Sequence, residues 1–198
     1  MRKLAKMGEE SLAKAGGGGR QGLALGNSEL RRDERNAGGS APSLRIRLAT
    51  PADRSRLIPV VNAAYSVEKF LGGTRTDEAR LAAMMEKGSI LMAEEDSGRP
   101  IATIYVELRG NRGYMGLLAV DPERQRRGLG GRMIQEGEAW LRSHGCEAVD
   151  IIVLNLRTEL FPVYRRFGFV ETRIEAFQPS RPLEPGFECH GIVMSKKL

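Results

Sequence analysis

A basic, glycine-rich segment holds the residues best suited to chemistry: Gln125-Arg126-Arg127-Gly128-Leu129-Gly130-Gly131. An amphipathic stretch follows it, and the first N–H groups of a helix are unpaired and carry partial positive charge. Glycine lets an anion approach such backbone groups closely. We therefore expect this segment to cradle an anion, and a diphosphate in particular. The alternative is a glycine-rich turn that binds nothing.

Two other phosphate-binding loops can be tested against the same residues. A P-loop requires Gly-Lys-Ser/Thr after four spacer residues, and the sequence lacks this motif here. A dinucleotide fingerprint, Gly-x-Gly-x-x-Gly, begins correctly at Gly128 and Gly130, but its third glycine position holds Met133. The segment is therefore interpreted as an anion site of another class.

The distribution of charge favours this local anion site over a nucleic-acid surface. The formal net charge is +6, and residues 1–43 carry eight basic and five acidic side chains. The first 43 residues and the rest of the chain therefore contribute +3 each. Basic residues in the rest concentrate between Arg124 and Arg132. We expect no nucleic-acid partner, and salt-dependent DNA binding through this segment is the weaker alternative.

The bulk composition predicts one folded domain after a tail. Residues 1–43 hold 9 of the 24 glycines and no aromatic residue, so they bury too little apolar surface to offset the entropy of ordering. Residues 44–198 suffice for one domain. The sequence shows neither a long apolar run nor a secretory leader, so we expect no membrane partner. Cys146 and Cys189 form no zinc or disulfide motif, and we expect no metal and a reducing, cytoplasmic location.

Hydrophobic periodicity and turn residues predict the elements that must position the loop. Short alternating or apolar runs indicate seven strands, at 44–48, 89–94, 101–108, 114–120, 148–154, 169–177 and 187–195. Helical spacing indicates helices starting after Thr50, capped by Thr76 and ended by Gly88, over 129–144, and around 162–166. The order β-α-α-β-β-β-α-β-α-β-β predicts a mixed α/β (α+β) domain with helices packed on a central sheet.

Three blocks of sequence together resemble the GNAT superfamily of N-acetyltransferases. Gln125 to Gly130 is similar to the family signature Gln/Arg-x-x-Gly-x-Gly/Ala, and Leu118 to Pro122 is similar to the Leu-x-Val-x-Pro that precedes it. Tyr164 to Phe169 resembles the family's Tyr-x-x-x-Gly-Phe. By the order of elements the resemblance covers residues 44–198. It implies a GNAT-like fold with a mixed, mostly antiparallel sheet of about seven strands.

The resemblance also implies which residues bind the cofactor, acetyl-CoA. Backbone N–H groups of the loop would bind the CoA pyrophosphate, and the preceding strand would pair with the pantetheine arm. The implied cofactor-binding residues are Leu118, Ala119, Val120, Gln125, Arg126, Arg127, Gly128, Leu129, Gly130, Gly131 and Asn155. Asn155 lies further from Tyr164 than in the family's usual pattern, so a turn-forming role is equally open for it.

Two catalytic residues follow from the same resemblance. Tyr164 would be the general acid, because a departing CoA thiolate needs a proton or a strong donor. A core tyrosine is the alternative. Glu107 would be the general base, because an amine is mostly protonated at neutral pH and must lose a proton before attack. A solvated glutamate at a strand end is the alternative for Glu107.

The acceptor is the part of the function that the sequence describes least. Tyr65, Glu68 and Phe70 would suit a cationic amine, and Phe177 and His190 are further candidates, with a structural strand histidine as the alternative for His190. We expect acetyl transfer from acetyl-CoA to a primary amine of a small molecule or peptide, by direct attack in a ternary complex. A non-catalytic acyl-CoA-binding or regulatory module on the same fold is the alternative. The oligomeric state is open, with a homodimer as one option.

Overall fold

The computed structural model describes residues 44–176 and 181–198, so the predicted tail and Phe177 lie outside the described residues. Within these ranges seven strands form one sheet in the order β1-β2-β3-β4-β5-β7-β6. Only β4 and β5 pair in parallel. The strands are β1 Arg45–Leu48, β2 Ser89–Glu94, β3 Pro100–Arg109, β4 Arg112–Val120, β5 Ala148–Leu154, β6 Val170–Ala176 and β7 His190–Lys197. The predicted mixed, mostly antiparallel sheet is confirmed.

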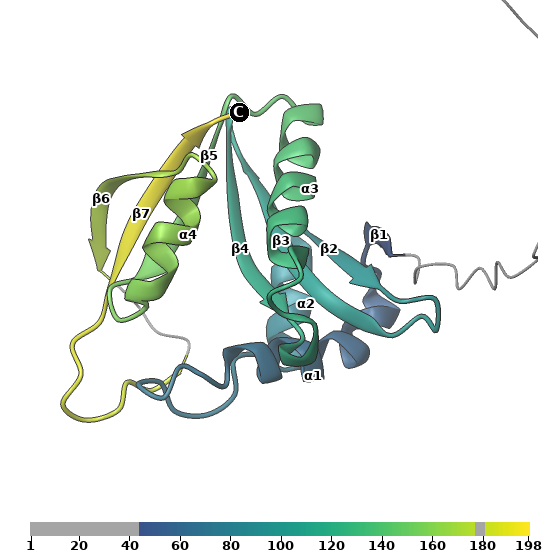
Figure 1. The fold of residues 1–198 in the computed structure, drawn as a ribbon, viewed down its shortest axis with the longest axis horizontal. Coiled ribbons are helices and arrows are strands. Elements are labelled where there is room, and N and C mark those ends of the chain that lie inside the picture. The colour runs from purple at the N-terminus through teal and green to yellow at the C-terminus, as the bar shows by residue number, and fades with distance from the viewer. Residues whose placement is uncertain (1–43, 177–180) are drawn as a thin grey trace, which may run out of the picture. The chain divides into compact units, whose positions relative to one another are not determined.

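Four helices flank the sheet within the described ranges: α1 Arg54–Tyr65, α2 Glu78–Lys87, α3 Leu129–Ser143 and α4 Phe161–Arg166. Figure 1 shows α3 and α4 in front of the sheet and α2 behind it. The strands accordingly bury apolar side chains on both faces. Ile104 and Val106 of β3 belong to the core that includes α3, whereas Tyr105 between them belongs to the core that includes α1 and α2.

The predicted start of the first helix after Thr50 is confirmed, although the chain first makes a 3-10 turn at Pro51–Asp53. The Asp53 carboxylate accepts hydrogen bonds from the backbone N–H of Thr50 (2.8 Å) and from the Arg47 guanidinium (2.8 Å to each oxygen). Asp53 is buried. This carboxylate therefore ties β1 to the beginning of α1.

Two predicted boundaries are wrong. The cap of α2 is Asp77, whose carboxylate accepts from the Arg80 N–H at 2.8 Å. Thr76 is instead buried, and its N–H donates to the Asn62 side chain. The last strand begins at His190 rather than at residue 187. Phe187 lies in the loop before it, where its ring packs on that of Phe70.

Candidate functional site

The parallel strands β4 and β5 separate halfway along their length. Their pairing runs only from Arg112 to Met115 of β4. Beyond that point the strands diverge, as Figure 1 shows. At the same place β4 has a bulge, because Leu117 and Leu118 together face the single residue Ile104 of β3. Leu117 adopts φ = 46°, a left-handed conformation that non-glycine residues rarely adopt.

The bulge determines to which side of β4, the predicted cofactor strand, the backbone N–H and carbonyl groups point. The N–H of Asp121 donates to the carbonyl of Ile101 on the β3 side. Backbone groups of successive strand residues point to opposite sides, so those of Val120 and Leu118 face the side where β5 has moved away. The Val120 carbonyl there accepts from the Gln125 amide at 3.1 Å. Ala119 between them is buried in the core.

The predicted anion loop lies between the end of β4 and the start of α3. Gly128 precedes the helix with φ = 78°, and Arg126 also has a positive φ of 62°. Such a turn directs successive N–H groups to one side, and those of the first helical turn, from Leu129 onward, have no intrahelical partner. The first helical bond is that of Arg132 N–H to the Gly128 carbonyl. The loop therefore has the geometry of an anion cradle.

The three glycines of the loop serve different physical needs. Gly128 requires its positive φ. A Cβ on Gly130 would meet nothing closer than Val120 at 3.7 Å, so its surface is open. A Cβ on Gly131 would lie 2.7 Å from the Phe167 ring, so this glycine lets the segment after α4 pack on α3. The side chains of Arg126 and Arg127 are exposed and form no ion pair with another described residue.

Tyr164 lies on α4 and packs, partly buried, against the core cluster that includes α3 and β5. Its ring packs edge-on against Phe169 at 5.9 Å between centroids. Its hydroxyl has no hydrogen-bond partner among the described residues, and Tyr65, Tyr114 and Arg157 lie within electrostatic reach of it. Burial raises the pKa of Tyr164 above its usual value, so the phenol keeps its proton at neutral pH.

Glu107 lies near the end of β3 with its carboxylate already engaged. It accepts from the Arg109 guanidinium at 2.8 Å and from the Tyr105 hydroxyl at 2.8 Å. These bonds, that from Arg109 above all, hold the pKa of Glu107 below its usual value. Glu107 faces the same side of the sheet as Tyr114, its register partner on β4. The group is therefore ionised and only weakly basic.

Asn155 follows β5 and is tied to the start of β7. Its side-chain oxygen accepts from the His190 N–H at 2.9 Å, and its side-chain nitrogen donates to the Glu188 carbonyl at 3.3 Å. These bonds agree with the alternative, structural role for Asn155. The backbone carbonyl of His190 also accepts from the Asn155 N–H, so this pair of residues closes the end of the sheet.

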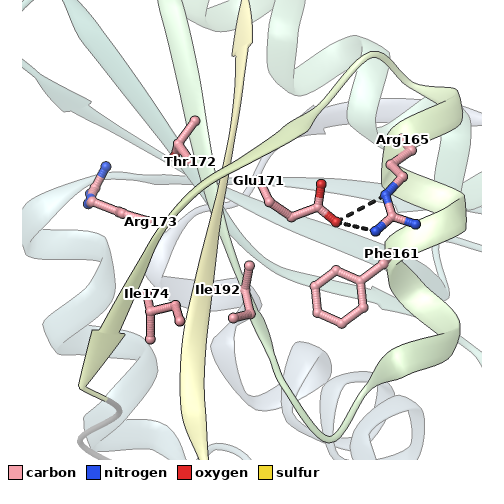
Figure 2. A pocket seen from close by; sticks show the side chains of 7 residues that line it. All are labelled: Phe161, Arg165, Glu171, Thr172, Arg173, Ile174 and Ile192. Carbon is pink, nitrogen blue, oxygen red and sulfur yellow. Dashed lines mark hydrogen bonds and ion pairs between the residues drawn. The ribbon is translucent and has the colours of Figure 1, made fainter.

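A groove of about 510 Å³ lies between α4 and β6, away from the loop. Its lining residues are Phe161, Arg165, Glu171, Thr172, Arg173, Ile174 and Ile192. Figure 2 shows Arg165 paired with Glu171 across it, with the Phe161 ring beside Ile192. None of the predicted cofactor or catalytic residues lines this groove.

The fold and the site define a class. A strand that leads into a glycine-rich loop at a helix start, in a mixed and mostly antiparallel sheet, is the arrangement that the resemblance to the GNAT superfamily implied. A family model described as "Acetyltransferase (GNAT) family" matches residues 61–169. The chain belongs to this family.

Comparisons with known proteins agree with this assignment. The ribosomal-protein-S18-alanine N-acetyltransferase of Escherichia coli superposes with a TM-score of 0.60 at 20% identity, over 78% of this chain and 94% of that one. The PaiA N-acetyltransferase of Thermoplasma acidophilum, solved with coenzyme A, superposes with a TM-score of 0.59 at 18% identity, over 79% and 99% of the two chains. These similarities establish the GNAT fold.

Curated relatives are similar over part of their length. The mycothiol acetyltransferase of Clavibacter sepedonicus is 28% identical over 50% of this chain and 33% of its own. That of Propionibacterium freudenreichii subsp. shermanii is 24% identical over 66% of this chain and 44% of its own. The chain thus spans less than half the length of these relatives.

Two features are absent from the described ranges. No helix in 44–176 or 181–198 has the length and apolar character needed to cross a membrane. No three His, Cys, Asp or Glu side chains of those ranges are grouped so that they could hold a metal ion.

Proposed function

We propose that the protein transfers an acetyl group from acetyl-CoA to a primary amine by direct attack in a ternary complex. One observation carries this proposal: the bulge at Leu117, the side of β4 that does not pair with β5 and the loop at Gln125 to Gly131 follow one another along the chain. Together they offer backbone groups to an extended ligand along β4 and N–H groups to an anion at its end. CoA has these two parts in this order.

The loop and strand divide the binding of acetyl-CoA between them. N–H groups from Arg126 to Gly131 would hold the pyrophosphate, and the exposed arginines at 126 and 127 would add charge. The backbone of Leu118 and Val120 would pair with the pantetheine arm. An N–H at the bulge would face the thioester oxygen and stabilise the oxyanion that forms during attack.

The reaction needs one proton donated and one removed. The amine nitrogen attacks the thioester carbon, the C–S bond breaks, and the CoA sulfur takes a proton or a strong hydrogen bond. Tyr164 would supply it, since its hydroxyl is unengaged and protonated at neutral pH. Glu107 would accept the proton of the amine, directly or through water. The hydrogen bonds from Arg109 and Tyr105 lower its pKa, so Glu107 is ionised and able to accept a proton.

Ligand-induced stabilisation tests the donor. Acetyl-CoA should raise the melting temperature, because specific binding stabilises the folded state. Gly128→Glu should abolish the shift, since it places a carboxylate and a strained φ where the pyrophosphate binds. Absence of any shift in the wild-type protein would end the proposal.

A screen of primary amines then separates enzyme from binding module. Release of free CoA that depends on an amine, with the acetylated amine found by mass spectrometry, is expected. A thermal shift with acetyl-CoA but no product from any amine would favour the non-catalytic acyl-CoA-binding module.

A further inference from the structure

Three arginines and one buried carboxylate form a cluster beside Tyr65. Its members come from three connections that are distant in sequence: Glu68 and Arg75 after α1, Arg157 between β5 and α4, and Arg181 before β7. The first and last of these connections run side by side, because Gly72 N–H donates to the Pro182 carbonyl at 2.9 Å. Figure 1 shows them passing below the diverging ends of β4 and β5.

Both carboxylate oxygens of Glu68 already accept hydrogen bonds from arginines of this cluster. Its side chain is 5% exposed; one oxygen accepts from Arg157 at 3.0 Å and the other from Arg181. A buried carboxylate whose two oxygens already accept from two guanidinium groups offers little to a cationic ligand. The structure therefore argues against the expectation that Glu68 recognises a cationic amine.

Arg75 is the member whose charge is not balanced. It lies 4.9 Å over the ring of Tyr65 and forms no ion pair with a described residue. Its Nε is buried and has no hydrogen-bond partner within the described ranges. An arginine held by a ring, with a buried donor left over, has the geometry that binds a planar anionic group.

The position of this charge relates it to the reaction. Arg75 and Arg157 both lie within electrostatic reach of Tyr65, and Arg157 and Tyr65 are within reach of Tyr164. Arg75 is therefore connected through Tyr65 to the neighbourhood of the expected general acid. A group bound there would belong to the acceptor.

We propose that the acceptor is an amino carboxylic acid whose carboxylate binds Arg75. The inference rests on the proposed acetyl transfer and specifies its substrate class. Two parallel N–H···O bonds from a guanidinium match a carboxylate, whereas Arg157 is already paired with Glu68 and Glu159 and leaves Arg75 as the charge available to the ligand. A plain amine or a polyamine would leave Arg75 unpaired and would itself be repelled.

Matched substrates test this inference. Amine-panel kinetics would compare free amino acids, with α-, β- and γ-amino groups, against the carboxamide of each. For each substrate the variant is compared with the wild-type protein, so the different basicity of acid and amide cancels. Arg75→Met should lower kcat/KM for the acids by about 10- to 100-fold, through KM, as expected for lost hydrogen bonds to a charged group. The amides and the KM of acetyl-CoA should be unaffected.

Two further variants serve as references. Arg75→Lys should keep part of the preference for acids, because it retains the charge without the planar fork. Arg173→Met removes an exposed arginine of β6 that pairs with Glu175. It should change neither the KM of the acceptor nor the KM of acetyl-CoA. If Arg75→Met does not fold, judged by its melting curve, the Arg75→Lys variant decides: it should lose more kcat/KM for the acids than for the amides, each compared with the wild-type protein.

The outcomes separate this inference from the proposed function. An equal loss for acid and amide in Arg75→Met, or no loss for either, overturns the inference and leaves acetyl transfer intact. No acetylated product from any amine and no thermal shift with acetyl-CoA means that acetyl transfer itself fails.

Discussion

The hydroxyl of Thr103 on β3 donates a 3.0 Å hydrogen bond to the backbone carbonyl of Leu117 on β4. Both residues are buried, and Leu117 is the residue with positive φ at the bulge. The bond replaces a ladder hydrogen bond that the bulge removes. Thr103 thus stabilises the conformation that directs the Leu118 backbone toward the diverging strands.

Thr103→Val should test this role. The substitution keeps the shape but leaves the Leu117 carbonyl buried without a partner, which should lower the free energy of unfolding by about 1–2 kcal/mol. It should also weaken acetyl-CoA binding, measured by calorimetry. Thr172→Val is the matched control. The Thr172 hydroxyl, on the exposed strand β6, donates at 3.2 Å to the backbone carbonyl of Val193 on β7. Equal effects of both variants on acetyl-CoA binding would remove Thr103 from this role.

The bulge marks a limit of prediction from sequence. The strand itself is evident from Tyr114 to Val120, and the loop after it from its glycines. The bulge depends on the register between β3 and β4, and one inserted residue leaves the local alternation of side chains almost unchanged. A left-handed Leu117 has no signal of its own, since leucine has no preference for that conformation.

Two neighbouring glycines of the loop should respond oppositely to alanine. Gly131→Ala should destabilise the protein by about 1–3 kcal/mol, since its Cβ would lie 2.7 Å from the Phe167 ring. Gly130→Ala should leave the melting temperature unchanged or slightly raised, but weaken acetyl-CoA binding by covering the open backbone. Chemical denaturation and calorimetry measure the two effects. A stable, fully binding Gly131→Ala protein would contradict the packing described for Phe167.

Protonation of Asp53 should lower the free energy of unfolding at low pH. The bonds from Arg47 hold the pKa of the folded Asp53 far below its unfolded value of about 4. A depressed folded pKa stabilises the fold fully above the unfolded pKa, and this stabilisation is lost as pH falls below it. Between about pH 5 and pH 2 the free energy of unfolding should decrease by about 2 kcal/mol from this group alone.

Asp53→Asn should flatten that part of the pH curve, measured by urea unfolding at several pH values. Its stability at pH 7 should be lower than that of the wild-type protein, because Arg47 loses a charged partner. Glu175→Gln, which removes an exposed pair with Arg173, should leave the curve as it is. An unchanged slope in Asp53→Asn would assign acid sensitivity to other groups.

A pair of variants can separate the contributions of Glu107 and Arg109 to turnover. Arg109→Met should raise the pKa of Glu107 toward its ordinary value, because the arginine is the main cause of the lowered pKa. If Glu107 accepts the proton, a stronger base should keep or increase kcat, whereas Glu107→Gln should lower it by about 100-fold. Steady-state kinetics at pH 7 measures both. Full activity of Glu107→Gln would leave Glu107 with the alternative role of a strand-end residue.

The cluster around Glu68 shows why some arrangements of residues cannot be predicted from sequence. Tyr164 could be predicted as a candidate because its motif is local to one short segment. Glu68 and its partners Arg157 and Arg181 are 89 and 113 residues apart along the chain, so no spacing rule connects them. Glu68 alone suggests affinity for a cation, and only the folded arrangement reverses that expectation.

The pKa of Tyr164 gives a prediction for the pH profile of turnover. Burial raises it above the ordinary value of about 10, while the nearby Arg157 opposes the effect. An acid that stays protonated should not limit kcat on the alkaline side, so kcat should hold level or rise from pH 7 to pH 10. Tyr164→Phe should lower kcat by about 100-fold or more while the thermal shift with acetyl-CoA persists. Tyr114→Phe, which removes a nearby hydroxyl on β4, should cost far less. A fall in wild-type kcat centred below pH 9, or equal losses in the two variants, would show that the Tyr164 hydroxyl is not the proton donor.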